Sequence, residues 1–424
     1  MKRRLITGAA VLLLVAALAI AWVMFMNLRD ESPRSGPAMP MPSTEQVTRG
    51  AYLALAGNCM GCHTTPGGAP YAGGRGVPTP FGTVMAPNLT PDEKTGIGSW
   101  SADDFWRALH NGRSRDGRLL YPAFPYPNYS RITRDDADAI HAWLRLVPAV
   151  EQANRPHELQ FPFNQQAALA VWRALYFRPG QHRADPQRAP EADRGAYLVE
   201  GLGHCNACHS SRNAFGASTG PLDLAGGLIP VQNWYAPSLT SAQEAGVAGW
   251  ETQNVVDLLK TGVSPQASVA GPMGEVVRGS TQHLSEPDLR AVAVYLKALP
   301  QTPATATEAA PDAATGAGAG AKLYERHCAG CHGDAGEGVS GAYPALAGNR
   351  AVTMRNVANL VHVVREGGFP PATVGNPRPY GMPPFATELS VEETAQLLSF
   401  VRGSWGNRAA AVTALEVERF RGGK

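Results

Sequence analysis

The chain has 424 residues and a formal net charge of +2, and only 17% of its residues are charged. Nucleic-acid binding needs a dense basic surface, so we expect no nucleic acid among the partners of this protein. Its 46 glycines and 35 prolines are many for a globular chain, and they fit small domains with extensive loops.

The first predicted element is an apolar helix at the N-terminus. Residues 2–4 are basic, and residues 5–26 carry no charge. Such a stretch, at ~1.5 Å per residue, spans about 33 Å and can cross a bilayer. Because basic residues stay in the cytoplasm, the remaining chain should be exported. We therefore predict that residues 1–28 are a membrane anchor or signal. Small residues at Ala17, Ala19 and Ala21 could allow cleavage, but the apolar residues 22–26 favour a retained anchor.

All six cysteines fall in three copies of one string, C-x-x-C-H. The copies are Cys59, Cys62 and His63; Cys205, Cys208 and His209; and Cys328, Cys331 and His332. Two thiols at this spacing can form thioethers to one haem while the histidine binds its iron. The sequence therefore predicts three covalently bound haem c groups, and places the iron-binding histidines at His63, His209 and His332.

Other uses of these cysteines fit the pattern less well. Zinc normally needs a second close pair of ligands, whereas these pairs lie 146 and 123 residues apart. A redox dithiol gives no reason for three histidines. If haem takes all six thiols, none is left for disulfides.

Each string lies in a repeated unit. A short amphipathic helix is predicted before each string, at 49–53, 194–198 and 321–324. A loop centred on proline follows, at Pro87, Pro237 and Pro344. Each unit then ends in a helix with 3.6-residue apolar spacing, at 136–147, 286–299 and 391–401, and Ser285 and Ser390 are the expected N-caps of the last two.

Composition predicts the boundaries between these units. They are an anchor or signal at 1–28, a spacer at 29–43, a first unit at 44–150, a connecting segment at 151–190, a second unit at 191–300, a flexible linker at 301–320, a third unit at 321–407 and a C-terminal tail at 408–424. An apolar helix at 167–177 should join the first two units into one rigid body. The third unit should then move more freely.

This order of elements resembles the class I cytochrome c fold. The resemblance implies an all-α protein with three tandem class I cytochrome c domains after an N-terminal transmembrane anchor. It also implies a hydrogen bond within each unit, donated by the histidine ring nitrogen that faces away from iron. The acceptors would be the carbonyls of Pro87, Pro237 and Pro344.

Low-spin electron-transfer haems usually hold iron between histidine and methionine. In this fold the methionine should lie some fifty to sixty-five residues after the string. Met273 stands 64 residues past His209, and Met382 stands 50 past His332. Methionine often fills gaps in cores, but both of these lie beside proline and glycine, so we predict that they are the iron ligands of the second and third units.

The first unit departs from this pattern. Phe124 stands 61 residues past His63, where the ligand is expected, and phenylalanine cannot coordinate iron. Met85 lies in the proline loop, which by the fold resemblance is on the histidine side of the haem. His110 aligns with positively charged residues at a helix end, so we expect it on the surface. An open or water-bound iron, Met85 and His110 all remain as possibilities.

Longer strings across all three units resemble one family, the membrane-bound triheme cytochrome c subunits of bacterial dehydrogenases for alcohols, aldehydes, gluconate, sorbitol or fructose. These strings are residues 81–83, 88–92, 95–98, 120–123, 201–205 and 404–407. The resemblance implies a partner dehydrogenase subunit carrying flavin, quinone or molybdenum, and a relay of its electrons haem to haem to ubiquinone or a terminal oxidase. It places the haem domains on the periplasmic side of the cytoplasmic (inner) membrane. The family normally has methionine at the position of Phe124.

No dinucleotide fingerprint or Ser-His-Asp arrangement is found, so no catalytic residue is predicted. We therefore expect a non-catalytic subunit. The alternative is a peroxidase-like haem catalyst or a ligand sensor that uses an open iron in the first unit.

Overall fold

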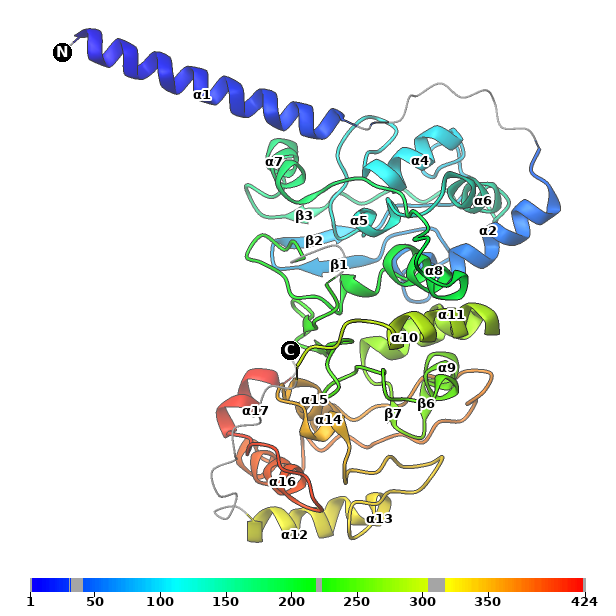
Figure 1. The fold of residues 1–424 in the computed structure, drawn as a ribbon, viewed down its shortest axis with the longest axis vertical. Helices are drawn as coiled ribbons and strands as arrows, with labels where there is room; N and C mark the ends of the chain where they lie inside the picture. Colours follow the sequence, from blue (N-terminus) through cyan, green and yellow to red (C-terminus); the bar gives the residue numbers. More distant parts are fainter. Residues whose placement is uncertain (1, 30, 32–40, 219–222, 304–316, 422–424) are drawn as a thin grey trace. The chain divides into compact units, whose positions relative to one another are not determined.

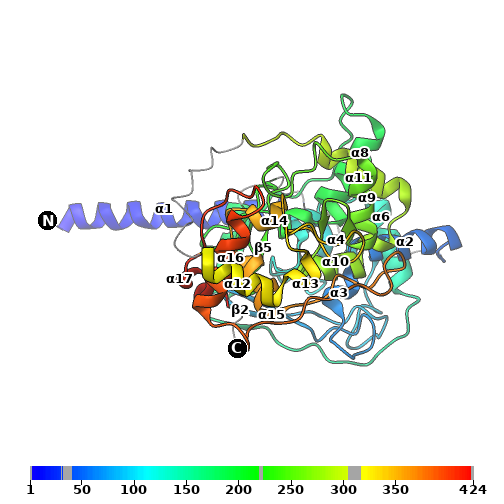
Figure 2. The ribbon, with the colours of Figure 1, turned by 90° about the horizontal axis from the view of Figure 1, so that it is seen from below.

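The computed structural model describes residues 2–29, 31, 41–218, 223–303 and 317–421, and Figures 1 and 2 show it in two views. The chain forms two compact units. The first consists of Met1–Ala54, Cys62–Arg183 and Asn213–Ala217. The second consists of Leu55–Gly61, Ala184–Arg212 and Ser218–Lys424.

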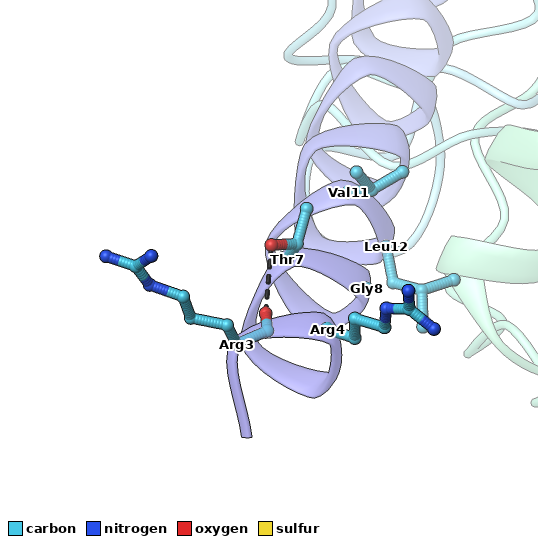
Figure 3. A pocket seen from close by; sticks show the side chains of 6 residues that line it. All are labelled: Arg3, Arg4, Thr7, Gly8, Val11 and Leu12. Carbon is cyan, nitrogen blue, oxygen red and sulfur yellow. Dashed lines mark hydrogen bonds between the residues drawn. The ribbon is translucent and has the colours of Figure 1, made fainter. Parts of the chain in front are cut away.

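The N-terminal apolar run is helical, as predicted. It forms α1 (Lys2–Leu28), which has 27 residues, none of them buried (Figure 1). Among the described residues it is the one helix long and apolar enough to cross a membrane, a test that signal sequences also pass. Figure 3 shows its first turns, where the Thr7 hydroxyl donates to the carbonyl of Arg3 and the Arg4 side chain extends along the helix.

The first haem string and its surroundings form short helices and one small sheet. In chain order they are α2 (Thr44–Ala56), α3 (Cys59–His63), β1 (Gly76–Thr79), β2 (Gly82–Met85), α4 (Ala102–Asn111), α5 (Tyr126–Tyr129), α6 (Arg134–Leu144), β3 (Glu158–Leu159) and α7 (Gln166–Tyr176). The predicted helices at 136–147 and 167–177 are confirmed as α6 and α7. The antiparallel sheet β1-β2-β3 was not expected, because its short strands lie in a glycine- and proline-rich stretch that predicts loops.

The second string follows the same plan. Its elements are α8 (Pro190–Tyr197), η1 (Leu198–Leu202), η2 (Cys205–Ala207), β4 (Gly227–Leu228), β5 (Tyr235–Ala236), α9 (Thr252–Thr261), β6 (Val263–Ser264), β7 (Ala267–Ser268), α10 (Pro272–Gly279), η3 (Thr281–His283) and α11 (Glu286–Lys297). Ser285 caps α11 as predicted, since its hydroxyl accepts from the backbone N–H of Asp288.

The third string lies among helices that share one hydrophobic core. They are α12 (Ala317–His327), α13 (Ala329–His332), α14 (Arg350–Thr353), α15 (Ala358–Glu366), α16 (Val391–Gly403) and α17 (Ala414–Phe420). Ser390 forms a capping box with Glu393 at the start of α16, which confirms the predicted cap. Helix α17 lies in the segment expected to be a tail, and its Val417 and Phe420 are buried in this core.

A glycine marks the contact between the helix before each string and a later helix. A Cβ atom at Gly50 would collide with the carbonyl of Ala139 in α6, and one at Gly195 with that of Ala291 in α11. Gly320 in α12 meets α16 in the same way. Because only hydrogen fits in these gaps, the helices approach backbone to backbone. The same packing at all three strings supports a structural repeat.

One expected linker boundary differs from the structure. Residues 317–320 were expected to be linker, but they begin α12 and pack against α16. Residues 304–316 of that linker lie outside the described residues. The second and third strings share one compact unit, and the first string is divided between the two units, because Cys59 belongs to the second unit and Cys62 and His63 to the first.

Side-chain contacts join the second and third strings within that compact unit. The Tyr235 N–H donates to the side-chain oxygen of Asn359 at 2.8 Å, and the amide of Asn359 donates to the Tyr235 carbonyl at 2.7 Å. The rings of Trp234 and His362 stack with their centroids 4.8 Å apart. These contacts oppose free movement of the third string's helices.

One buried histidine in α6 should make stability depend on pH. His141 is 1% exposed and stacks on Phe105 at 5.0 Å, and neither ring nitrogen has a hydrogen-bond partner among the described residues. Burial, with a smaller effect of Arg145, lowers its pKa to about 4 from the usual 6.5.

His141 in the unfolded chain should take up a proton at a higher pH than in the folded protein. Its contribution to stability is thus complete above pH 6.5 and is lost as the pH falls towards 4. We expect the loss to be about 2–3 kcal/mol. The free energy of unfolding, measured with urea across this pH range, should depend less steeply on pH in His141→Phe than in the wild type, because phenylalanine cannot titrate. Identical slopes for the two proteins would contradict the assignment.

Candidate haem-binding sites

The six cysteines are free thiols, and they form no disulfide with one another. The second cysteine of each string is exposed, at Cys62, Cys208 and Cys331. Burial raises the pKa of Cys205 to about 12 and that of Cys328 to about 11. A reactive dithiol needs the opposite shift, because the thiolate is its reactive form. Cys205 and Cys328 therefore do not have the properties of the reactive thiol in a redox pair.

The three histidines are held in the same way, by the bonds that the fold resemblance implied. Nδ1 of His63 lies 2.8 Å from the Pro87 carbonyl oxygen. The corresponding distances are 2.7 Å from His209 to Pro237 and 2.9 Å from His332 to Pro344. Since a carbonyl only accepts, Nδ1–H is the donor in each pair. Nε2 is then left with its lone pair, as an iron ligand requires.

Burial lowers the pKa of His63 and His209, although the bond to proline opposes this effect. A neutral imidazole is therefore favoured at these two positions. This protonation state agrees with a histidine that donates from Nδ1 and binds a metal through Nε2. The three histidines and the paired thiols beside them thus fit covalently attached haem.

A glycine after each histidine also helps to shape the site, and the sequence analysis missed it. Gly73, Gly226 and Gly338 each donate a backbone N–H to the histidine carbonyl, at 2.8, 2.9 and 2.8 Å respectively. Each has a positive φ, and a Cβ atom there would lie only 2.5–2.7 Å from backbone atoms of the proline loop. These glycines let the loop approach the histidine closely enough for the Nδ1 bond.

Met273 lies in the first turn of α10 rather than in the expected loop. It follows Gly271, which has a φ of 55° and leaves room for the ring of Trp234. Trp234 in turn stands three residues before Pro237. The segment carrying the predicted ligand and the segment holding the histidine are therefore packed together in the second unit.

The third string shows an equivalent arrangement. Met382 is half-buried against the hydrophobic core, and its backbone is paired in both directions with Gly368. Tyr380, two residues earlier, packs edge-on against Tyr343 with their ring centroids 5.2 Å apart. Because Tyr343 directly precedes Pro344, an aromatic contact again ties the ligand segment to the proline loop.

Phe124 occupies the corresponding loop after the first string. Its ring lies 5.3 Å from that of Tyr129, within an aromatic group that includes Tyr126. Tyr121 in the same loop packs edge-on against His157 at 5.1 Å. Nδ1 of His157 accepts the N–H of Met85, so this histidine links the loop to the proline segment. The sequence analysis did not identify His157.

The two other possible ligands of the first string lie in different settings. Met85 is buried at the end of β2, two residues before the proline that holds His63. The expectation that His110 lies on the surface was wrong. Its side chain is buried, stacks on Trp106 at 4.5 Å and places Nδ1 2.8 Å from the carbonyl of Ser130. The chain after α4 folds back over the helix end, which the helical pattern alone did not predict.

Known proteins match this chain over most of its length. The family model for cytochrome c matches residues 47–147 and 317–405, which contain the first and third strings. The cytochrome c subunit of alcohol dehydrogenase (quinone) from Gluconobacter oxydans (strain 621H) is 38% identical, over 88% of this chain and 82% of the relative. The cytochrome c subunit of gluconate 2-dehydrogenase from Pantoea cypripedii is 35% identical, over 96% and 94%.

The cytochrome subunit of fructose dehydrogenase from Gluconobacter japonicus is 32% identical, over 96% of this chain and 89% of the relative. All three alignments extend over nearly the whole of both proteins, and they agree with the histidine geometry at the three strings. This chain belongs to the family of cytochrome c subunits of bacterial alcohol, gluconate and fructose dehydrogenases.

Proposed function

We propose that this protein is a triheme electron-transfer subunit. It accepts electrons from a partner dehydrogenase subunit, whose own cofactor is flavin, quinone or molybdenum, and passes them to ubiquinone or a terminal oxidase. Three tandem class I cytochrome c domains each hold one haem c. The observation that carries the proposal is the Nδ1 bond to a proline carbonyl at each of the three histidines.

Haem c, when bound, supplies an iron that can exist as Fe(II) or Fe(III). The chain's own groups attach it, orient it and tune it. Each cysteine pair supplies the two thioether sulfurs, and His63, His209 and His332 supply Nε2. Each proline carbonyl fixes the imidazole ring of the histidine bonded to it and makes Nε2 of that histidine more basic. Met273 and Met382 supply soft thioether ligands that favour Fe(II).

The protein is proposed to reside in the cytoplasmic membrane, with α1 as a single-pass anchor and the haem domains in the periplasm. Two observations support this location. Arg3 and Arg4 lie at the start of α1, and no charge interrupts residues 5–26. Covalent haem attachment in bacteria is also completed outside the cytoplasm, so the rest of the chain must be exported.

A second function is favoured by one feature of the first string. Phe124 stands in place of methionine, and Met85 lies beside the proline segment that holds His63. Among the described residues, no methionine then stands out as a ligand for the first string, and an open or water-bound iron would be expected there. Peroxidase-like catalysis or sensing of a small ligand would use such a site.

The number of haems tests the main proposal. The mature chain should carry three covalently added haems by intact-mass measurement and by haem absorbance per chain. Replacing both Cys328 and Cys331 with serine should remove one of them and leave the other two. A chain with no added haem, or with zinc in its place, would refute the proposal. Reduction of the intact protein by a dehydrogenase that co-purifies with it from membranes would then identify the partner.

A further inference from the structure

The end of α1 is built into the first compact unit through helix α7. The side-chain amide of Asn27 donates to the carbonyl of Ala170 at 2.9 Å, and the guanidinium of Arg173 donates to the Asn27 side-chain oxygen at 2.9 Å. Arg113 also donates to the Asn27 backbone carbonyl at 3.2 Å. Asn27 lies directly after the apolar run 5–26, so α7 contacts α1 at the level where its apolar surface ends (Figure 1).

Charged groups also hold the end of α1 against the rest of the first compact unit, a contact that we call the α1 junction. Glu31 pairs with Arg107, whose side chain is almost fully buried, and with Arg113 at 2.9 Å. Leaving one of these buried charges without its partner is strongly unfavourable. The position of α7 along the axis of α1 is therefore set by the fold of the first unit.

Beside this junction, α7 exposes apolar side chains. Val171, Leu175 and Tyr176 are 47%, 51% and 38% exposed, and Phe215 is 56% exposed. Trp172 connects them, because its indole N–H donates to the Phe215 carbonyl at 2.9 Å and its ring lies 5.6 Å from that of Tyr176. These five residues form what we name the α7 patch, and all of them belong to the first compact unit.

We propose that the α7 patch lies in the outer leaflet of the membrane, with α7 parallel to the bilayer surface. The inference rests on the proposed anchoring by α1. Lipid is identified as the partner of the patch by its continuity with α1, since the patch adjoins this helix at the point where the apolar surface of the helix ends. Tryptophan and tyrosine beside aliphatic side chains are also the residues that favour the membrane–water boundary. Lipid contact would hold the first haem domain close to the membrane surface.

The experiment measures how fast a membrane-impermeant maleimide labels single cysteines in the full chain. The variants are Val171→Cys and Leu175→Cys in the patch and Leu146→Cys as a control. Leu146 is 63% exposed in the same compact unit, so its access to water without a membrane is similar. The six native cysteines do not react once haem is attached. Each rate is divided by the rate of the same variant unfolded in urea.

In vesicles of phosphatidylcholine and phosphatidylglycerol, both patch positions should react roughly tenfold more slowly than position 146. Equal rates at all three positions would overturn the proposal. Slow labelling that needs an added dehydrogenase subunit would also overturn it, because a protein would then cover the patch. Haem absorbance and resistance of the chain to carbonate extraction are measured on the same samples, so a failure of haem binding or of anchoring is recognised separately.

Discussion

Phe124→Met is expected to convert the haem of the first string to a low-spin form and to raise its reduction potential. The substitution supplies a thioether sulfur at the position corresponding to Met273 and Met382, the iron ligands proposed for the other two strings. A change of axial ligand can move a haem potential within a range of about 0.8 V, so a shift of order 0.1 V is expected here. Optical and electron paramagnetic resonance spectra should show the change in spin state.

The loop around Phe124 can accept methionine without refolding. Its turn is formed by backbone bonds, from the Phe124 N–H to the Tyr121 carbonyl at 3.0 Å and from the Tyr126 N–H to the Phe124 carbonyl at 2.7 Å. Neither bond depends on the aromatic ring. The ring does pack against Tyr129, so a modest loss of stability should accompany the change in ligation.

Binding of carbon monoxide or cyanide provides the matched measurement. The wild-type chain should bind either ligand readily at one haem, and Phe124→Met should suppress that binding. Met382→Leu serves as the reverse control, since it should create a second haem that binds these ligands. If Phe124→Met leaves the spectra unchanged, another side chain already fills the sixth position. Rapid peroxide turnover by the wild-type chain that is lost in Phe124→Met would instead favour the catalytic function.

The haem strings and most helices could be predicted from the sequence because their signals are local. The C-x-x-C-H spacing is contained in five residues, and the apolar pattern of α11 and its Ser285 cap lie within one helix. The bonds from histidine to proline were also foreseen, from the resemblance to a known fold.

Features that depend on distant segments were not predicted. The three glycines that support the histidine loops follow their histidines by 10, 17 and 6 residues, so no fixed spacing reveals them. The burial of His110 depends on the loop that carries Ser130, twenty residues later. In the same way, the start of α12 lies in a run of alanine and glycine that resembles a linker until its contact with α16 is known.

Replacing each of two glycines in α12 with alanine is expected to change the stability of the protein in opposite directions. Gly320→Ala should destabilise the helices around the third string by about 2 kcal/mol, because the new methyl group would meet the Gln396 carbonyl and the Phe400 side chain. Gly318 lies two residues earlier in the same helix, and no atom of the described residues is within 4 Å of its Cβ position. Gly318→Ala should therefore stabilise α12 by about 0.5 kcal/mol through its higher helix propensity.

Thermal unfolding of the haem-loaded chain, followed by far-ultraviolet circular dichroism, measures both effects. Gly195→Ala should destabilise the helices around the second string in the same way as Gly320→Ala does in the third, since it faces the Ala291 carbonyl of α11. Stabilisation by Gly320→Ala would mean that α12 is not held against α16, and that residues 317–320 behave as the linker their composition suggests. Opposite signs for positions 318 and 320 would instead place the start of the third haem domain within the segment that reads as linker.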